Sequence, residues 1–347
     1  MRLSVLDQSP ISEGSTNGEA LRATLDLARA TDRLGYHRFW VAEHHGGAMA
    51  GASPEALIGP IALATDHLRV GSGGVMLPYY SPLKVAETFN LLDGLAPGRI
   101  DLGLGRAPGT DPMRSFALHR DRRQGPPDDF PEQLVELLAH LGRRDYNGSD
   151  HPFRSMRVRT DGEHGDGPQP WLLGSSAQSA IWAAQLGLPY AYADFIAPDG
   201  EAHAQLYRER FEPSPQLAAP QVLIATWAVA AETEEEALAL TSSGRMMFKL
   251  LRRGRPILIP PVEVAQRFLE HEGDTEPPRR MVCGTPEQVR ARLEERVQRY
   301  VADELMLVTI TFDPAAKIRS YELLAEAFGL EAPAADGRDA AVTSSAP

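Results

Sequence analysis

The sequence is poor in cysteine and lysine and has no long apolar run. Only three of its 35 basic residues are lysines, and its single cysteine, Cys283, excludes an internal disulfide and a metal site built from several cysteines. No run of about 18 apolar residues occurs, the length that a membrane-spanning helix needs. The N-terminus also lacks the basic and apolar regions of a signal peptide. We therefore expect a cytoplasmic protein. Cys283 precedes a predicted helix start, and we expect it to be unreactive.

Positive charge is in deficit as well. Lysine and arginine total 35 against 47 acidic residues, which gives a net charge of −12. Nucleic acids and anionic membranes bind basic surfaces, so this balance argues against both as partners. A phosphate-bearing cofactor stays compatible with it, because such a group needs only a local arginine or a helix N-terminus. Apolar residues make up 43% of the chain, which is typical of a globular protein.

Strand-like and helix-like segments alternate along the chain. Eight apolar segments predict strands at 1–6, 36–42, 68–76, 99–104, 170–174, 189–194, 221–230 and 304–311. Caps and apolar spacing predict helices at 17–34, 54–65, 82–93, 129–141, 176–186, 200–211 and 232–250, with two more starting at Thr285 and Asp313. The stretches 106–128 and 252–281 interrupt this rhythm as insertions.

Eight strand–helix units with right-handed crossovers are the number that closes a barrel, so we predict an α/β fold, a (β/α)8 TIM barrel with insertions at its mouth. An open, doubly wound sheet would need a glycine-rich turn after the first strand, where the sequence has Asp7-Gln8-Ser9-Pro10. We expect a single barrel domain over residues 1–330. The small, polar segment 331–347 has no periodicity and predicts a disordered tail.

The active site of such a barrel lies at the carboxyl ends of its strands. The second strand ends in Glu43-His44-His45, residue types that also bind metals. Adjacent histidines at a strand end point to opposite sides, however, and no H-x-H or H-E-x-x-H spacing occurs. The alternatives are a structural histidine or a substrate-facing His44 that transfers a proton or binds an anion. We predict His44 as the catalytic residue and no metal site.

Two further strand ends carry groups that suit a phosphate. Residues 103–109 look like a dinucleotide fingerprint but are one residue too long for G-x-G-x-x-G, which leaves Arg106 as an anion-binding side chain or as a salt bridge to a neighbouring loop. Ser175, Ser176 and Ser179 surround a predicted helix N-terminus and suit N-capping or phosphate binding. Because Arg106 and these serines come from adjacent strands, a shared phosphate site is favoured.

Aromatic residues near the strand ends suggest a pocket for a ring system. Trp227, Tyr79 and Tyr80 fall close to the predicted mouth and are candidates to line it. Trp182 lies inside a predicted helix and is expected to pack in the core.

The sequence resembles the bacterial luciferase-like, flavin-dependent monooxygenases along nearly its whole length. The resemblance rests on LDQSP (6–10), FWVAEHHG (39–46), the segment from VGSGG to GRAPGTD (70–111), LLGSSAQSAIWAAQLGLPYA (172–191) and CGTPEQV (283–289). The LDQSP and GRAPGTD segments are most similar to a subgroup that occurs in actinomycete natural-product tailoring and in ordinary bacterial genomes.

This resemblance implies roles for individual residues. His44 matches the catalytic histidine beside the flavin ring, and the cofactor-binding positions are Gly73, Gly74, Arg106, Ser175, Ser176 and Ser179. Arg106 matches the arginine that holds the FMN phosphate, with the serines as its partners, and Gly73-Gly74 matches a non-prolyl cis peptide under the isoalloxazine. Two positions depart from relatives: Gly105 replaces luciferase's reactive cysteine, and Asp194 stands where the subgroup often has histidine.

The resemblance further implies a monooxygenase that uses reduced FMN and O2, through a C4a-hydroperoxyflavin, to insert one oxygen into an organic substrate. A hydroxylation or epoxidation in polyketide or other natural-product tailoring, as in antibiotic biosynthesis, is one hypothesis. The chain has no NAD(P)H fingerprint, so we expect a separate flavin reductase as partner, and the resemblance suggests a homodimer packed through helices near the second and third strands. The alternatives are an F420-dependent hydride-transfer enzyme and a non-catalytic flavin-binding protein.

Overall fold

The computed structural model describes residues 1–106, 111–119, 129–146, 151–156, 158, 167–274, 276–277 and 280–333. Its strands are β1 (Arg2–Asp7), β2 (Arg38–Val41), β3 (Arg69–Ser72), β4 (Val75–Met76), β5 (Ile100–Gly105), β6 (Gln169–Gly174), β7 (Tyr190–Ala193), β8 (Val222–Ala230), β9 (Met281–Gly284) and β10 (Glu304–Val308). Neighbouring strands follow the order β10-β1-β2-β3-β5-β6-β7-β8, and β8 also pairs with β10. The sheet therefore closes on itself, which confirms the predicted (β/α)8 barrel.

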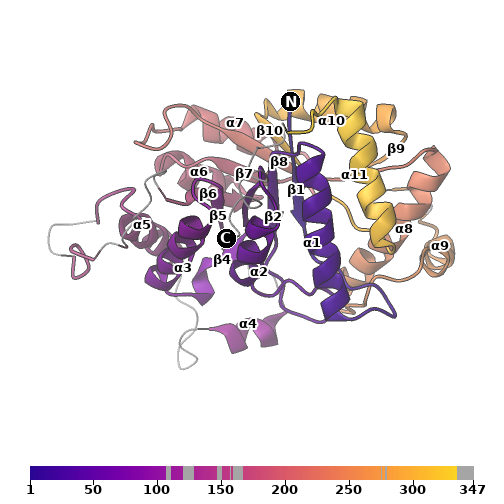
Figure 1. Cartoon of the computed structure of the whole chain (residues 1–347), viewed down its shortest axis with the longest axis horizontal. Coiled ribbons are helices and arrows are strands. Elements are labelled where there is room, and N and C mark those ends of the chain that lie inside the picture. The colour runs from indigo at the N-terminus through magenta and orange to yellow at the C-terminus, as the bar shows by residue number, and fades with distance from the viewer. Residues whose placement is uncertain are drawn as a thin grey trace, which may run out of the picture.

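Helices surround the strands on the outside of the barrel (Figure 1). They are α1 (Asn17–Arg33), α2 (Pro54–Leu63), α3 (Pro82–Leu95), α4 (Pro112–Leu118), α5 (Phe130–His140), α6 (Ala177–Gln185), α7 (Glu201–Glu209), α8 (Glu234–Arg252), α9 (Val262–His271), α10 (Pro286–Tyr300) and α11 (Pro314–Phe328), with a short 3-10 turn at Leu77–Tyr79. Within the described part of the chain, no helix is both long and apolar enough to cross a bilayer.

Three elements lie where the sequence predicted insertions or a loop. The predicted insertion 252–281 contains α9, and the predicted insertion 106–128 contains α4. β9 places Cys283 in a strand that the sequence did not predict. β8 is nine residues long, which is enough to pair with two strands on the same side. Its residues 223–227 pair with β10, and its residues 227–230 pair with β9.

The end of the described chain packs against the first helix–strand connection. The backbone carbonyl of Glu331 approaches Gly35 so closely that a Cβ there would lie 2.2 Å from it, and Gly35 has a φ of +81°. Glycine is therefore required at this position. Most of the predicted tail 331–347 falls outside the described residues.

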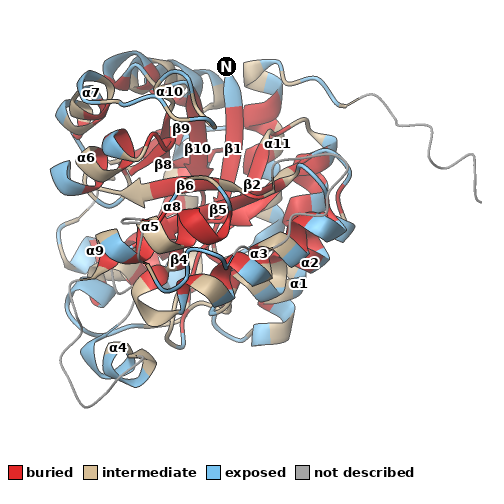
Figure 2. Cartoon of the chain, turned by 90° about the vertical axis from the view of Figure 1, so that its left-hand side faces the viewer, coloured by how far each residue is buried: buried red, intermediate tan, exposed pale blue. Residues whose placement is uncertain are grey.

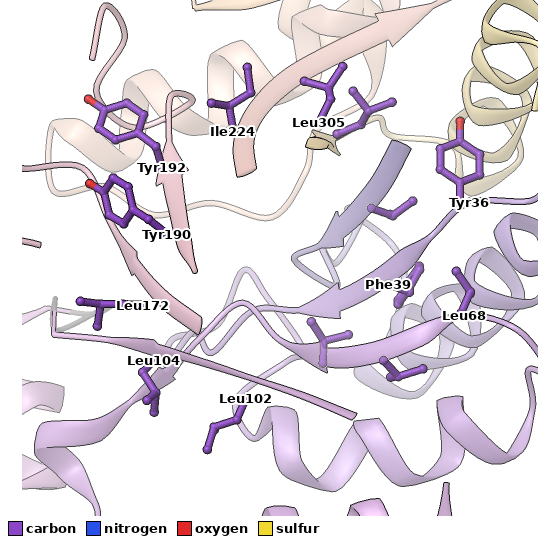
Figure 3. Packing of buried hydrophobic residues seen from close by; sticks show 14 of the residues in the cluster. Tyr36, Phe39, Leu68, Leu102, Leu104, Leu172, Tyr190, Tyr192, Ile224 and Leu305 are labelled. Atoms are coloured by element: carbon purple, nitrogen blue, oxygen red, sulfur yellow. The ribbon is translucent and has the colours of Figure 1, made fainter. Parts of the chain in front are cut away.

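Alternating side chains divide the core into two parts. Those that point out of the barrel pack beneath the helices, and Figure 3 shows Phe39, Leu102 and Tyr190 among them. Those that point inward, such as Trp40 and Met306, fill the barrel interior. This alternation is the period of two that a strand imposes, and Figure 2 shows most of the strand residues buried.

A cluster of charged groups occupies the amino-terminal end of the barrel interior. The Arg38 guanidinium lies between Asp101 (Nη1–Oδ2, 2.6 Å) and Glu304 (Nε–Oε1, 2.9 Å), and all three side chains are almost fully buried. Arg69 and the Trp40 indole also donate to Asp101. Burial alone raises the pKa of Asp101, but the charges of Arg38 and Arg69 outweigh it and hold that pKa below its ordinary value.

Candidate functional site

A cavity of about 430 Å3 lies inside the barrel toward the carboxyl ends of the strands. We call it the main cavity. Its walls are largely apolar and aromatic, with Leu6, Trp40, Phe195 and Met306 among them, and its polar groups come from Arg106 and three serines. A largely apolar cavity of this size with a few grouped polar side chains is typical of a site for a small molecule or cofactor.

The polar groups gather at the N-terminus of α6. Ser176 is the N-cap: its hydroxyl accepts from the Ser179 N–H at 3.3 Å, while the Ser179 hydroxyl donates to the Ser176 carbonyl at 2.8 Å. A Cβ on Gly174 would lie 2.2 Å from the Ser179 Oγ, so only glycine lets β6 end this close to the helix. The free N–H groups of the first helical turn and the helix dipole favour an anion at this place.

Arg106 approaches the same helix from the end of β5. Its guanidinium carbon lies 5.4 Å from the centroid of the Trp182 ring on α6, and both residues line the main cavity. Arg106 is exposed and borders the main cavity, so it can meet a ligand that enters from solvent. The arrangement joins a guanidinium, serine hydroxyls and a helix N-terminus, which together suit a phosphate group.

Glycines form one side of the main cavity. The Gly73–Gly74 peptide bond is cis, as the resemblance implied. A Cβ on Gly74 would lie 2.8 Å from the Gly103 carbonyl oxygen, and one on Gly73 would lie 2.5 Å from the Leu6 Cδ1. The flat backbone surface therefore depends on the absence of side chains. Gly105 differs, because a Cβ there would meet only the Met76 thioether at an ordinary 3.6 Å.

Glu43 organises the loops after β2 and β4. Its fully buried carboxylate accepts from the Met76 N–H at 2.9 Å and from the Tyr80 hydroxyl at 2.9 Å, and it contacts the His45 Nε2 at 2.8 Å. Burial and the negative charge of Glu43 raise the pKa of Tyr80, so this phenol stays protonated and donates. Among the residues that the structure describes, no group of three or more acidic, histidine or cysteine side chains is placed to hold a metal ion.

The comparisons with known proteins agree with this geometry. A family profile described as luciferase-like monooxygenase matches residues 1–303. The chain belongs to the luciferase-like monooxygenase family. A luciferase-like monooxygenase of Escherichia coli (strain K12) is 42% identical over 92% of this chain and 95% of its own length. An N-acetyl-S-alkylcysteine monooxygenase of Bacillus subtilis (strain 168) is 38% identical over 94% of this chain and 98% of its own.

Solved structures of similar fold cover almost the whole chain. The crystal structure of apo-MsnO8 has a TM-score of 0.85 at 40% identity and covers 96% of this chain and 99% of its own. The oxygenating constituent of 3,6-diketocamphane monooxygenase from Pseudomonas putida, solved with FMN, has a TM-score of 0.71 at 17% identity and covers 96% of this chain and 99% of its own. An F420-dependent secondary alcohol dehydrogenase has a TM-score of 0.64 at 15% identity and covers 95% and 99%. The last two likenesses concern the fold alone.

In this luciferase-like barrel, six of the seven predicted site residues border one cavity. They are Gly73, Gly74, Arg106, Ser175, Ser176 and Ser179. His44 lies at the same end of the barrel and is half-buried, and its backbone N–H donates to the Gly51 carbonyl at 2.9 Å. It is not among the described residues that line the main cavity. Its catalytic role stays a prediction.

The aromatic wall of the luciferase-like cavity differs from the sequence prediction. Tyr79 and Tyr80 do not line it: the Tyr79 hydroxyl donates to the Ser115 Oγ and that of Tyr80 to Glu43. Trp227 borders a separate cavity. Trp182, expected in the core, does line the main cavity, together with Trp40, Phe130, Tyr192 and Phe195. Trp182 lies on α6, the helix whose N-cap is Ser176. Its place on the same helix as the predicted phosphate site was the one feature of the sequence that could have assigned it to the cavity.

Asp194 follows β7 and lines a separate cavity together with Arg296 and Tyr300. It is buried, accepts from the Tyr300 hydroxyl at 2.7 Å and from Thr226 at 3.1 Å, and pairs with Arg296 at 2.5 Å. It does not line the main cavity in the described structure. Through these contacts Asp194 ties β7 and β8 to α10. Cys283 is buried on β9, and burial raises the pKa of its thiol, which opposes reactivity.

Proposed function

We propose that this chain is a flavin-dependent monooxygenase that uses reduced FMN and O2 to oxygenate an organic substrate. The observation that carries the proposal is the main cavity, where Arg106 and the N-terminus of α6 form a phosphate-sized polar end beside an apolar, aromatic chamber. Membership of the luciferase-like monooxygenase family supports the oxygenating reaction.

The residues present fit FMN. Arg106 and the serines at 175, 176 and 179 would hold its phosphate through charge and N–H or O–H donors. Gly73 and Gly74 border the chamber, where a flat ring would lie against backbone that carries no side chain. Trp40, Leu6 and Met306 line the inner part of the chamber and exclude water from it.

When bound, reduced flavin supplies the electrons that activate O2. The chain offers no NAD(P)H fingerprint, and we therefore propose that a separate reductase delivers the reduced flavin. The name of the Bacillus subtilis relative supports oxygen transfer to a small organic molecule. Hydroxylation or epoxidation in natural-product tailoring stays a prediction from the sequence.

The proposal is tested by anaerobic titration with reduced FMN, followed by rapid mixing with oxygenated buffer. We expect saturable binding of FMN, which Arg106→Ala weakens by about 10- to 100-fold because a charge-assisted phosphate contact is lost. Arg106→Lys keeps the charge and should retain part of the affinity. A chain that binds F420 and ignores FMN would overturn the proposal in favour of hydride transfer.

The role of His44 is tested separately. The histidine that the resemblance implies beside the flavin predicts that His44→Ala keeps FMN affinity but loses product formation. The readout is binding of reduced FMN beside the yield of oxygenated product with an added flavin reductase. Intact affinity together with intact turnover would remove His44 from the mechanism.

A further inference from the structure

A second cavity, of about 320 Å3, lies between β8, the end of α8 and the residues before β9. We call it the basic pocket. Its lining is two aromatic rings, one acid and five cations: Trp227, Phe248, Asp274, Arg245, Lys249, Arg252, Arg253 and Arg280. In a chain with a net charge of −12, this local excess of positive charge is a distinct feature.

The nearby acids neutralise only some of these cations. Asp274 pairs with Arg245 at 3.1 Å and Lys249 at 3.0 Å, and Glu272 pairs with Arg253 at 2.5 Å. Arg280 instead lies over the Phe248 ring at 4.4 Å and the Trp227 ring at 5.8 Å, and Arg252 lies 6.0 Å from the Phe248 centroid. Neither Arg252 nor Arg280 forms an ion pair with a carboxylate in the described part of the chain.

This uncompensated charge affects Arg280 itself. Burial and, after it, the neighbouring charge of Arg252 lower the pKa of Arg280 from its ordinary value. Thr275, Pro278 and Arg279, which fall outside the described residues between Asp274 and Arg280, add no negative charge. A bound anion would relieve the repulsion between the two guanidinium groups.

Two buried N–H donors on the pocket's lining also have no acceptor. The Trp227 Nε1 and the Arg245 Nε form no hydrogen bond within the described structure, although Trp227 is only 3% and Arg245 only 6% exposed. Buried donors in native proteins are almost always paired, and leaving one unpaired is costly. Both N–H groups lie beneath the surface of the pocket, so the charged groups that can reach a ligand there are the guanidinium groups of Arg252 and Arg280, which favour a ligand that carries negative charge.

The basic pocket adjoins the main cavity. Trp227 lies two residues beyond Ala225 on β8, and Ala225 borders the main cavity. The Trp227 ring also stacks on Phe195, another residue of the main cavity, with centroids 6.4 Å apart and planes at 30°. The Phe195–Trp227 pair therefore joins the linings of the two cavities.

We propose that the basic pocket holds the carboxylate of the molecule that is oxygenated, with Arg252 and Arg280 as the specificity-determining residues. The apolar remainder of the substrate passes the Phe195–Trp227 pair into the main cavity. This assignment rests on the proposed monooxygenase function. It restricts the substrates to apolar or aromatic carboxylic acids and excludes neutral analogues of the same shape.

The test compares phenylbutyrate with the neutral phenylbutyramide as probes of the full chain loaded with oxidised FMN. Calorimetry measures their affinities, and the visible spectrum of the bound flavin reports whether the phenyl end reaches the main cavity. We expect the acid to bind at least tenfold more tightly than the amide and to shift the spectrum. The double variant Arg252→Gln/Arg280→Gln should lose that preference while FMN affinity and the unfolding temperature stay unchanged.

Arg290→Gln, which removes an exposed arginine paired with Glu294, is the matched control and should behave as wild type. Equal affinity for acid and amide, or a preference that survives in the double variant, would overturn the proposal. Tight binding of the acid with no change in the flavin spectrum would also overturn it, since the anion site would then be separate from the substrate site. Failure of FMN itself to bind would refute the monooxygenase function instead, which the FMN titration detects before any probe is added.

Discussion

Arg38 lies between two buried carboxylates at the amino-terminal end of the barrel interior, and its loss would leave both without their main counter-charge. Removing one partner of a buried ion pair costs about 3–5 kcal/mol, because the remaining charge stays desolvated. We expect Arg38→Met to lower the free energy of unfolding by about this amount, measured by urea denaturation.

The exposed Arg29–Asp26 pair provides the control for this substitution. The two atoms are 3.0 Å apart but the side chains are 48% and 62% exposed, so Arg29→Met should change stability by less than about 1 kcal/mol. Adding Glu304→Gln to Arg38→Met should restore part of the loss by removing an uncompensated charge. Equal costs for the two methionine variants would contradict the role assigned to the cluster.

His37, beside this cluster, gives the fold a dependence on acid. Burial, followed by the charges of Arg38 and Arg2, lowers the pKa of His37 from 6.5 to about 4. Between these values the unfolded chain takes up a proton that the folded chain refuses, so stability is full above pH 6.5 and falls as the pH drops toward 4.

His37→Gln removes this proton uptake from the unfolded state. For a half-buried ring, solvent screening reduces the effect to roughly 1 kcal/mol at pH 5. Denaturation at pH 7 and pH 5 should therefore show a smaller loss in the variant than in wild type. The same loss in both proteins would mean that carboxylates alone produce the acid sensitivity.

At this scale the sequence located the polar part of the candidate site and missed much of its apolar part. Arg106 and Ser175 directly follow strands, and Ser176 and Ser179 begin the helix after the second of them. A charged or hydroxyl side chain at the carboxyl end of a barrel strand ordinarily faces the mouth of the barrel. Trp182 does not follow a strand end, and a tryptophan inside an amphipathic helix is ordinarily predicted to pack in the core. Tyr79 and Tyr80 follow a strand too, but the buried carboxylate of Glu43 and the Ser115 hydroxyl bind their phenols.

Among the elements, α6 and α10 both begin with a capping box, but only the N-terminus of α6 borders the main cavity. Their N-caps are Ser176 and Thr285. Loss of an N-cap hydroxyl costs about 1 kcal/mol. We expect Ser176→Ala and Thr285→Ala to destabilise the protein equally in thermal or urea unfolding.

Flavin affinity separates the two helices. Ser176→Ala should weaken FMN binding by about tenfold, because it removes one hydrogen bond to a charged group. Thr285→Ala should leave FMN binding unchanged. Fluorescence titration of FMN measures both. An unaltered FMN affinity in Ser176→Ala would show that Ser176 only caps α6 and does not contact the flavin.

The elements that the sequence predicted well are those with strong periodicity or clear caps. Every strand of the closed barrel and every helix that packs directly on it is near its predicted position. β9 was missed because it follows directly on a predicted insertion, lies outside the eight strand–helix units and pairs with only the last part of β8. α9 was missed because it follows a run rich in arginine and proline, although its buried Ala265 and Leu269 have helical spacing. Both are additions to the barrel rather than parts of its repeat.

On the scale of the whole molecule, the outer face of α2 and α3 carries apolar side chains that the fold itself leaves uncovered. Leu63 at the end of α2 is 70% exposed, and Leu91 and Leu95 on α3 are 64% and 54% exposed. The two helices pack on each other, and Figure 2 shows exposed positions along both. Exposed leucines on two helices that pack on each other are consistent with a surface that another protein covers.

We propose that a second copy of this chain covers this face, in agreement with the homodimer that the sequence resemblance suggested. Leu91→Glu introduces a charge that a dimer would have to bury, while a monomer would leave it in water at no cost. Sedimentation equilibrium should give twice the 37.9-kDa chain mass for wild type and the single mass for Leu91→Glu. Leu251→Glu, at a leucine of α8 that is 47% exposed, places the same charge outside the proposed interface and should remain dimeric. A wild-type monomer, or a Leu91→Glu protein that dimerises as tightly as wild type, would show that α2 and α3 do not form the interface.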